Sequence, residues 1–166
     1  MLRNPFYTGK FEYPVGSGDW YQGTYEPLVS QHLFEEVGKV LSIVDVVLED
    51  LRQRAVKRVG VLAIGFTLDH RLYQNRIEQE RMECEVISSE IAERLDKAIF
   101  AVMEGKDGTE EQSIAIAAVK FLHDKQVDAI VLGCSEVPLL LQERQNENHL
   151  LNPAQLLAEA AVRQAL

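Results

Sequence analysis

The chain has 166 residues, of which 46% are hydrophobic and 26% are charged, and its formal net charge at pH 7 is −9. This length and composition suffice for one ordinary globular domain with a sizeable core. The acidity argues against nucleic-acid binding, which needs a basic face, and no apolar run approaches the roughly 18 residues of a membrane-spanning helix.

Residues 1–30 differ in composition from the rest of the chain. They hold most of the aromatic residues, three of the five prolines and four of the ten glycines. We therefore predict an extended, turn-rich N-terminal arm, whose aromatic side chains pack either on their own domain or on a partner chain. The first twenty residues contain no hydrophobic stretch of the secretory type, so we expect no export signal.

Residues 31–166 are predicted to form one α/β domain. In chain order we expect a helix over 31–51, a buried strand over 59–65, a helix over 70–82, a strand over 84–88, helices over 89–104 and 109–125, a buried strand over 128–133 and a closing helix from 153. Thr109 and Asn152 are the expected N-caps of the last two helices. Alternating strands and helices predict a three-layer sandwich with a mainly parallel sheet.

Two of the predicted strands end in the same way. The segments VGVLAIGFT (59–67) and DAIVLGCSE (128–136) each close a buried strand with glycine and then offer a hydroxyl or thiol. Ligands of open parallel sheets bind beyond the carboxyl ends of the strands. Both segments therefore direct polar groups to the expected active-site edge.

Cys134 is the residue in this pattern with the most reactive side chain. It comes directly after a buried strand and just before a predicted helix. Free backbone N–H groups and the helix dipole at such a position favour the thiolate, so we expect the thiol pKa to fall from about 8.5 toward neutrality. Inert cysteines are also common in protein cores, so position alone leaves a catalytic and a structural role open.

The segment Gly-Cys-Ser-Glu (133–136) resembles the second-cysteine motif of aspartate/glutamate racemases, which is usually Gly-Cys-Thr followed by Glu or His. Ser135 keeps the hydroxyl of the usual threonine, and Glu136 is similar to the aspartate- and hydantoin-racemase side of the family. The segment 57–73 also resembles the family's strand–Gly-Thr–helix–Tyr segment. The likeness covers about residues 40–166.

The resemblance implies one half of the Asp/Glu racemase fold and a cofactor-independent isomerase with no metal, acting on an amino acid or a related carboxylate. In that family one thiolate removes the Cα proton and a thiol on the opposite face returns one. Cys134 would be one of these acid/base groups. Thr67 and Ser135 would bind substrate, with a helix N-cap as the alternative for Thr67. Glu136 would orient the thiol or bind a substrate amine, unless it only stabilises the first helical turn.

The second acid/base is not evident in the sequence. The family's other thiol lies in an Asn- and Thr-rich motif, and no Cys-Asn-Thr occurs here. Cys84 opens a predicted strand and is assigned a structural role. His70 follows a strand end and is a possible second acid/base, because histidine titrates near neutrality. The alternative for His70 is a solvent-facing histidine at a helix start.

Three functions therefore stay open at this point. The chain is a racemase, impaired by the absence of the second cysteine motif, or a non-catalytic ligand- or partner-binding relative, or a single-cysteine decarboxylase of the same superfamily. Two cysteines without zinc spacing predict free thiols, no metal and a cytoplasmic location. A half-sized relative would expose the surface that its other half covers, which predicts a homo-oligomer.

Overall fold

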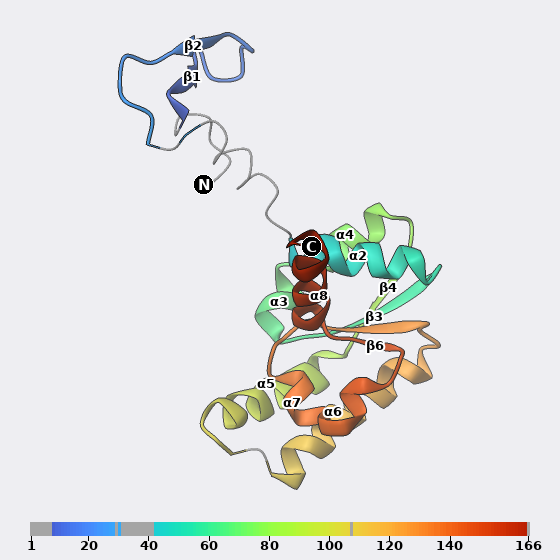
Figure 1. Ribbon diagram of the computed structural model, residues 1–166. Coiled ribbons are helices and arrows are strands. Elements are labelled where there is room, and N and C mark those ends of the chain that lie inside the picture. Colours follow the sequence, from blue (N-terminus) through green and yellow to red (C-terminus); the bar gives the residue numbers. More distant parts are fainter. Residues whose placement is uncertain (1–7, 29, 31–41, 107, 166) are drawn as a thin grey trace. The chain divides into compact units, whose positions relative to one another are not determined.

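The computed structural model describes residues 8–28, 30, 42–106 and 108–165 (Figure 1). Contacts divide the chain into two units, residues 1–40 and 41–166, and each unit is described by itself. The predicted boundary between residues 30 and 31 lies beside residues outside this description and stays a prediction. The start of the helix predicted over 31–51 also lies outside it.

The first unit contains a β-hairpin. Its strands β1 (Lys10–Glu12) and β2 (Trp20–Gln22) pair in antiparallel orientation. Phe11 lies opposite Tyr21, and their rings stack with centroids 5.9 Å apart. The backbone N–H of Gly18 donates to the Glu12 carboxylate at 2.6 Å. A cross-strand aromatic pair and a carboxylate that binds the turn thus hold the hairpin.

The second unit is built on a four-stranded parallel sheet in the order β4-β3-β5-β6. Its strands are β3 (Arg58–Leu62), β4 (Glu83–Val86), β5 (Ala129–Leu132) and β6 (Leu150–Leu151). The three predicted strands therefore share one parallel sheet, and the predicted fold class is confirmed. Strand β6 was not predicted, because two residues are too short to show a hydrophobic pattern.

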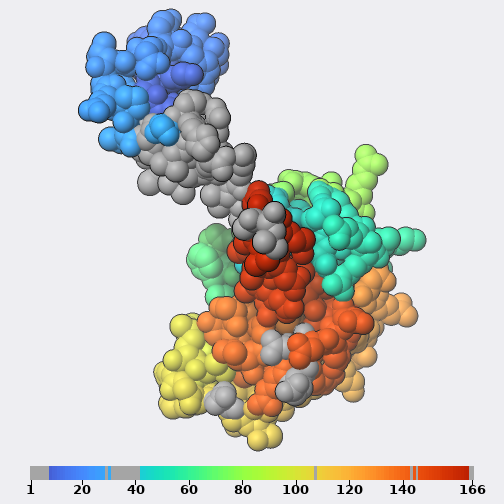
Figure 2. Space-filling view, viewed as in Figure 1, coloured from blue at the N-terminus to red at the C-terminus, as the bar shows by residue number. Residues whose placement is uncertain are grey.

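Helices cover both faces of this sheet. They are α2 (Ile43–Gln53), α3 (Gly65–Asp69), α4 (Gln74–Gln79), α5 (Ser89–Met103), α6 (Thr109–Asp124), α7 (Val137–Leu141) and α8 (Pro153–Ala165), with a 3-10 turn over Gln142–Asn146. Helices α2, α4 and α8 lie on one face, and α5, α6 and α7 lie on the other (Figure 1). In the space-filling view α2 and α8 pack side by side (Figure 2).

The helix boundaries differ from the sequence predictions at two places and agree at a third. The helix predicted over 70–82 is shorter, because Arg71 and Arg81 have φ of 51° and 62°, outside the helical region. The N-cap of α6 is Gly108, so the capping role predicted for Thr109 is wrong. Asn152 caps α8 as predicted, and its side-chain oxygen accepts the N–H of Ala154 at 3.1 Å.

Side chains along the central strands alternate between two cores. On β5, Ala129 and Val131 pack toward α2, α4 and α8, whereas Ile130 and Leu132 pack toward α5, α6 and α7. All four are at most 2% exposed. A strand that is buried on both faces reads as a continuous apolar run, which is why the sequence identified it.

The loops after β3 and β5 leave the sheet toward opposite faces. The chain from β3 leads to α4 on one face, and the chain from β5 leads to α7 on the other. In open α/β sheets, a divergence between neighbouring parallel strands is where ligands bind, in a crevice at the carboxyl ends of the strands. The backbone N–H of Gly133 donates to the carbonyl of Leu62 at 2.8 Å, which ties the two loops together at this crevice.

The opposite end of the sheet is held by Asp128. Its carboxylate accepts the backbone N–H groups of Lys57 at 2.9 Å and Arg58 at 2.8 Å, and these bonds lower the pKa of the carboxyl. We expect Asp128→Ala to lower the free energy of unfolding at pH 7 by about 1 kcal/mol. Because the folded pKa lies below the unfolded one, this stabilisation is present above the unfolded value near pH ~4 and is lost as the pH falls through the folded pKa.

Chemical denaturation of the unmodified chain and of Asp128→Ala, between neutral pH and about pH 3, measures the difference in their free energies of unfolding. Asp124→Ala is the matched control, because Asp124 is an exposed carboxylate at the end of α6. Equal losses of unfolding free energy in Asp128→Ala and Asp124→Ala would contradict the role assigned to Asp128. So would a loss in Asp128→Ala that does not shrink toward low pH.

Candidate active site

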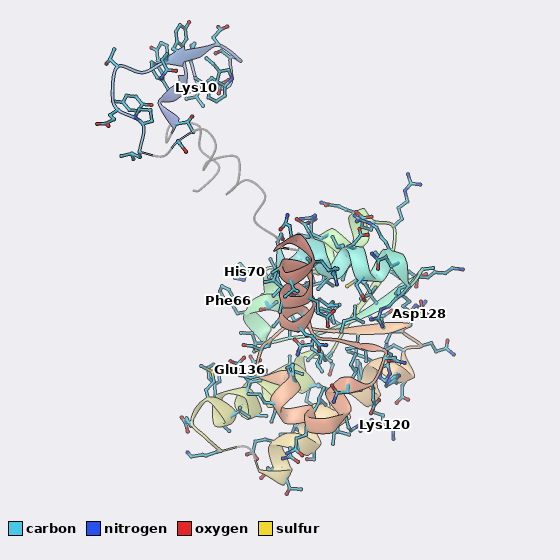
Figure 3. The ribbon with its side chains drawn as sticks, viewed as in Figure 1. Lys10, Phe66, His70, Lys120, Asp128 and Glu136 are labelled. Atoms are coloured by element: carbon cyan, nitrogen blue, oxygen red, sulfur yellow. The ribbon has the colours of Figure 1, made fainter. Side chains whose placement is uncertain are left out.

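Cys134 lies two residues beyond β5, in the loop that leads to α7, and its side chain is partly buried. Its sulfur donates to Glu136 Oε2 at 2.8 Å, and Ser135 Oγ donates to the same oxygen at 2.9 Å. Glu136 lies just before α7, beside the sheet (Figure 3). One carboxylate oxygen therefore accepts hydrogen bonds from a thiol and a hydroxyl of consecutive residues.

The predicted lowering of the Cys134 pKa is wrong for this structure. Burial and then the hydrogen bond to Glu136 raise the pKa of the thiol to about 11. The backbone N–H of Glu136 acts in the opposite direction but is outweighed. The same pairing lowers the pKa of Glu136, with the thiol as the first cause. The resting site therefore holds a neutral thiol beside an ionised carboxylate.

Gly133 permits the close packing beneath this loop. A Cβ atom at Gly133 would lie 3.0 Å from the Cβ of Ala63 and 3.1 Å from Cε2 of Tyr73. Tyr73 is 3% exposed, and burial followed by the charge of Cys134 raises its pKa. The Tyr73 ring thus packs against the cysteine loop at Gly133. Sequence reasoning placed Tyr73 in the racemase-like segment but did not identify it as a site residue.

Asp96 of α5 approaches the site from the face of the sheet that α7 also covers. The backbone N–H of Gly65, the first residue of α3, donates to both of its carboxylate oxygens, at 3.0 and 3.3 Å. The charge of Asp96 also contributes to the raised pKa of Cys134. Sequence reasoning missed Asp96, because it lies in the middle of an amphipathic helix and belongs to no motif.

Thr67 and His70 both lie on or next to α3. Thr67 is the third residue of the helix and is partly buried, and the N-cap is Ile64, so the capping alternative for Thr67 is wrong. His70 is exposed at the end of α3 rather than at a helix start. Its Nδ1 is 2.9 Å from the carbonyl oxygen of Phe66, and the two rings lie 4.1 Å apart (Figure 3). Their predicted roles in binding and proton transfer stay predictions.

Cys84 lies in β4, where it pairs with Val59 and packs against the core beneath α2, α4 and α8. Burial is the first cause that raises its pKa to about 11, and both cysteines are free. Within the described part of the chain, no three His, Cys, Asp or Glu side chains are grouped so that they could hold a metal ion. None of the described helices is long and apolar enough to cross a membrane.

A family model described as Asp/Glu/Hydantoin racemase matches residues 38–161. The chain is 27% identical over 137 residues to Glutamate racemase 3 of Caldanaerobacter subterraneus, a match that covers 76% of this chain and 48% of that protein. It is also 26% identical over 126 residues to a protein of the pnlA 3′ region of Pectobacterium carotovorum, covering 75% of this chain and 83% of that protein.

Two solved structures share the fold. An aspartate racemase homologue from Pyrococcus horikoshii aligns with a TM-score of 0.66 at 23% identity, over 81% of this chain and 62% of its own. An aspartate racemase from Picrophilus torridus aligns with a TM-score of 0.62 at 21% identity, over 75% of this chain and 52% of its own. The chain thus spans about half the length of the glutamate racemase and between half and two thirds of these two structures.

The thiol–carboxylate pair gives a direct prediction for alkylation. The Glu136 carboxylate stabilises the neutral thiol, so Glu136→Gln should lower the pKa of Cys134 and increase its thiolate fraction. We expect iodoacetamide to label Cys134 roughly two- to tenfold faster near neutral pH. Mass spectrometry separates the two thiols, so Cys84 is the internal reference and should keep its rate. Unchanged or slower labelling of Cys134 would show that the carboxylate does not control the thiol.

Proposed function

Because this chain belongs to the Asp/Glu/Hydantoin racemase family, we propose that it breaks and re-forms the Cα–H bond of an amino acid or a related carboxylate, with Cys134 as acid/base and no cofactor. The observation that carries the proposal is the hydrogen-bonded pair of Cys134 and Glu136 at the carboxyl end of β5. This pair lies within the matched residues and at the crevice where ligands of parallel sheets bind.

The proposed chemistry begins with loss of the Cys134 thiol proton to solvent, which breaks the hydrogen bond to Glu136. The thiolate then takes the Cα proton, and the electron pair of the C–H bond stays on carbon, next to the substrate carboxylate. The proton returns from the Cys134 thiol to carbon. A thiol with a pKa of about 11 is a strong base but is ionised in only about one molecule in ten thousand at pH 7.

The other predicted site residues have binding roles in this proposal. Ser135 and Thr67 contact the substrate carboxylate, and Glu136 both orients the thiol and offers a charge to the substrate amine. Ser135 Oγ and Cys134 Sγ share one acceptor oxygen, which supports their acting on the same ligand. His70, the C-cap of α3, is the candidate for the second acid/base that full racemisation would require.

Chemistry that needs one base is the second candidate. Of the two thiols, only Cys134 lies at the carboxyl end of a strand near the crevice, because Cys84 is inside β4. A single thiol supports decarboxylation of a malonate derivative, or exchange of a proton on one face. Homo-oligomer formation and a cytoplasmic location are parts of the proposal that rest on the sequence, and a non-catalytic binding role is its alternative.

Exchange of the α-proton in D₂O, followed by NMR across the proteinogenic amino acids, tests the proposal. Deuterium should enter Cα faster than the enantiomer forms, because one base returns a proton mostly to the face from which it came. Below the pKa of about 11, the rate should rise roughly tenfold for each pH unit, in proportion to the thiolate. Cys134→Ala should abolish exchange, whereas Cys84→Ala is the matched thiol variant and should retain it.

The proposal would be overturned if Cys134→Ala still exchanged the α-proton. It would also be overturned if the unmodified chain exchanged the α-proton of no substrate. Racemisation as fast as exchange would instead establish a second base. The variants Cys84→Ser and His70→Asn would then identify which residue returns the proton to the opposite face.

A further inference from the structure

A groove of about 450 Å³ lies at the carboxyl ends of β3 and β4. Residues of α3 and the chain before and at the start of α4 form one wall, and the end of β4 with α5 forms the other. Gly65 and Asp96, which belong to the candidate active site, line this groove as well. Cys134 is not itself a lining residue, and Asp96 is the link between the two, because its charge also acts on the Cys134 thiol.

The groove is negatively charged. Three carboxylates line it, from Asp69, Glu93 and Asp96. Among the described residues of its lining, Arg71 is the one cation, and its guanidinium is already bound by Asn75 at 2.8 Å and by Glu78 at 2.6 Å. A second substrate carboxylate would thus meet carboxylates and an arginine that is already paired, whereas a cationic group would be attracted.

The placement of these charges follows from helical geometry. The α5 residues of the lining are Ser89, Ala92, Glu93 and Asp96, which repeat at i, i+3, i+4 and i+7. Residues at this spacing share one face of a helix, and Arg94 lies off that face, whereas Lys97 follows Glu93 at i+4 and borders the face without lining the groove. The acidic character of the wall is therefore fixed by the register of α5.

Gln74 provides an independent indication of what the groove binds. It lines the groove and is 4% exposed, and its side-chain Nε2 donates to the carbonyl of Leu68 at 2.8 Å. Its Oε1 has no hydrogen-bond partner among the described residues. A buried amide oxygen can be satisfied only by a hydrogen-bond donor. The groove therefore combines negative charge with an unused hydrogen-bond acceptor. Both features favour a positively charged ligand that carries N–H groups.

The backbone at this edge reinforces the same preference. The N–H of Gly65 would be a donor for an anionic ligand, but it already binds both oxygens of Asp96. A negative side chain fixed beside the crevice disfavours a second substrate carboxylate and favours an ammonium or guanidinium group.

We propose that this groove receives the positively charged side chain of the substrate, so that the substrates are amino acids bearing an amine or guanidinium, such as lysine, ornithine or arginine. The inference rests on the proposed function, since it names the substrate class of that site. It excludes aspartate and glutamate as preferred substrates.

Binding is tested without turnover by titrating the ¹⁵N-labelled chain with lysine or arginine and following the backbone signal of Gly65 and the side-chain amide of Gln74. Norleucine is the matched ligand that lacks only the terminal amine of lysine. Lysine and arginine should shift both signals, whereas norleucine and glutamate should not. Glu93→Gln should weaken lysine binding by about two- to fivefold. Asp124→Asn, which removes an exposed carboxylate on α6, should leave it unchanged.

Exchange of the α-proton in D₂O separates this inference from the proposed function. Faster exchange with lysine or arginine than with aspartate or glutamate supports both. Preference for the acidic amino acids keeps the proposed function and overturns the inference. Lysine-induced shifts without exchange of any amino acid support the groove as a cation site and overturn the proposed function. The absence of lysine- and arginine-induced shifts, or an unchanged affinity in Glu93→Gln, overturns the inference.

Discussion

The parallel pairing of β3 with β5 is the constraint on which the site depends. Both strands are buried on two faces, so their register is held by packing from above and below as well as by the backbone ladder. The hydrogen bond from Gly133 to Leu62 extends this register beyond the end of β5. The loop after β5 leads to α7 on the face that α5 also covers, and Asp96 of α5 binds Gly65 after β3. Residues that are distant in the sequence therefore meet at this edge of the sheet.

The sequence predicts the parts of this arrangement that burial determines. Continuous apolar runs identified β3 and β5, and the residues that follow them directed attention to Thr67 and Cys134. The groups that set the electrostatics were harder to find. Asp96 reaches the site by a tertiary contact between α5 and α3, and such a contact leaves no local pattern. The two residues of β6 form a strand only because β5 offers a free edge.

The pKa of Cys134 shows why a local rule failed. The rule that a helix N-terminus stabilises a thiolate assumes a long helix and an accessible sulfur. Here α7 has five residues, the sulfur is partly buried, and a carboxylate two positions away accepts a hydrogen bond from the neutral thiol. Burial and the carboxylate act in the same direction, and together they outweigh the single backbone N–H at Glu136. The motif therefore locates the thiol, whereas the packing around it sets its protonation state.

The acidic groove and the raised pKa of the Cys134 thiol share one contributor, Asp96, although burial and the hydrogen bond to Glu136 raise that pKa more. Asp96 lines the groove and also opposes ionisation of Cys134. A cation bound beside Asp96 would offset that charge and stabilise the thiolate, so a basic substrate would lower the pKa of its own catalytic base. Linkage is reciprocal, so the thiolate form must bind such a substrate more tightly than the thiol form. An acidic substrate would have the opposite effect, because its second carboxylate would further suppress the thiolate from which the chemistry starts.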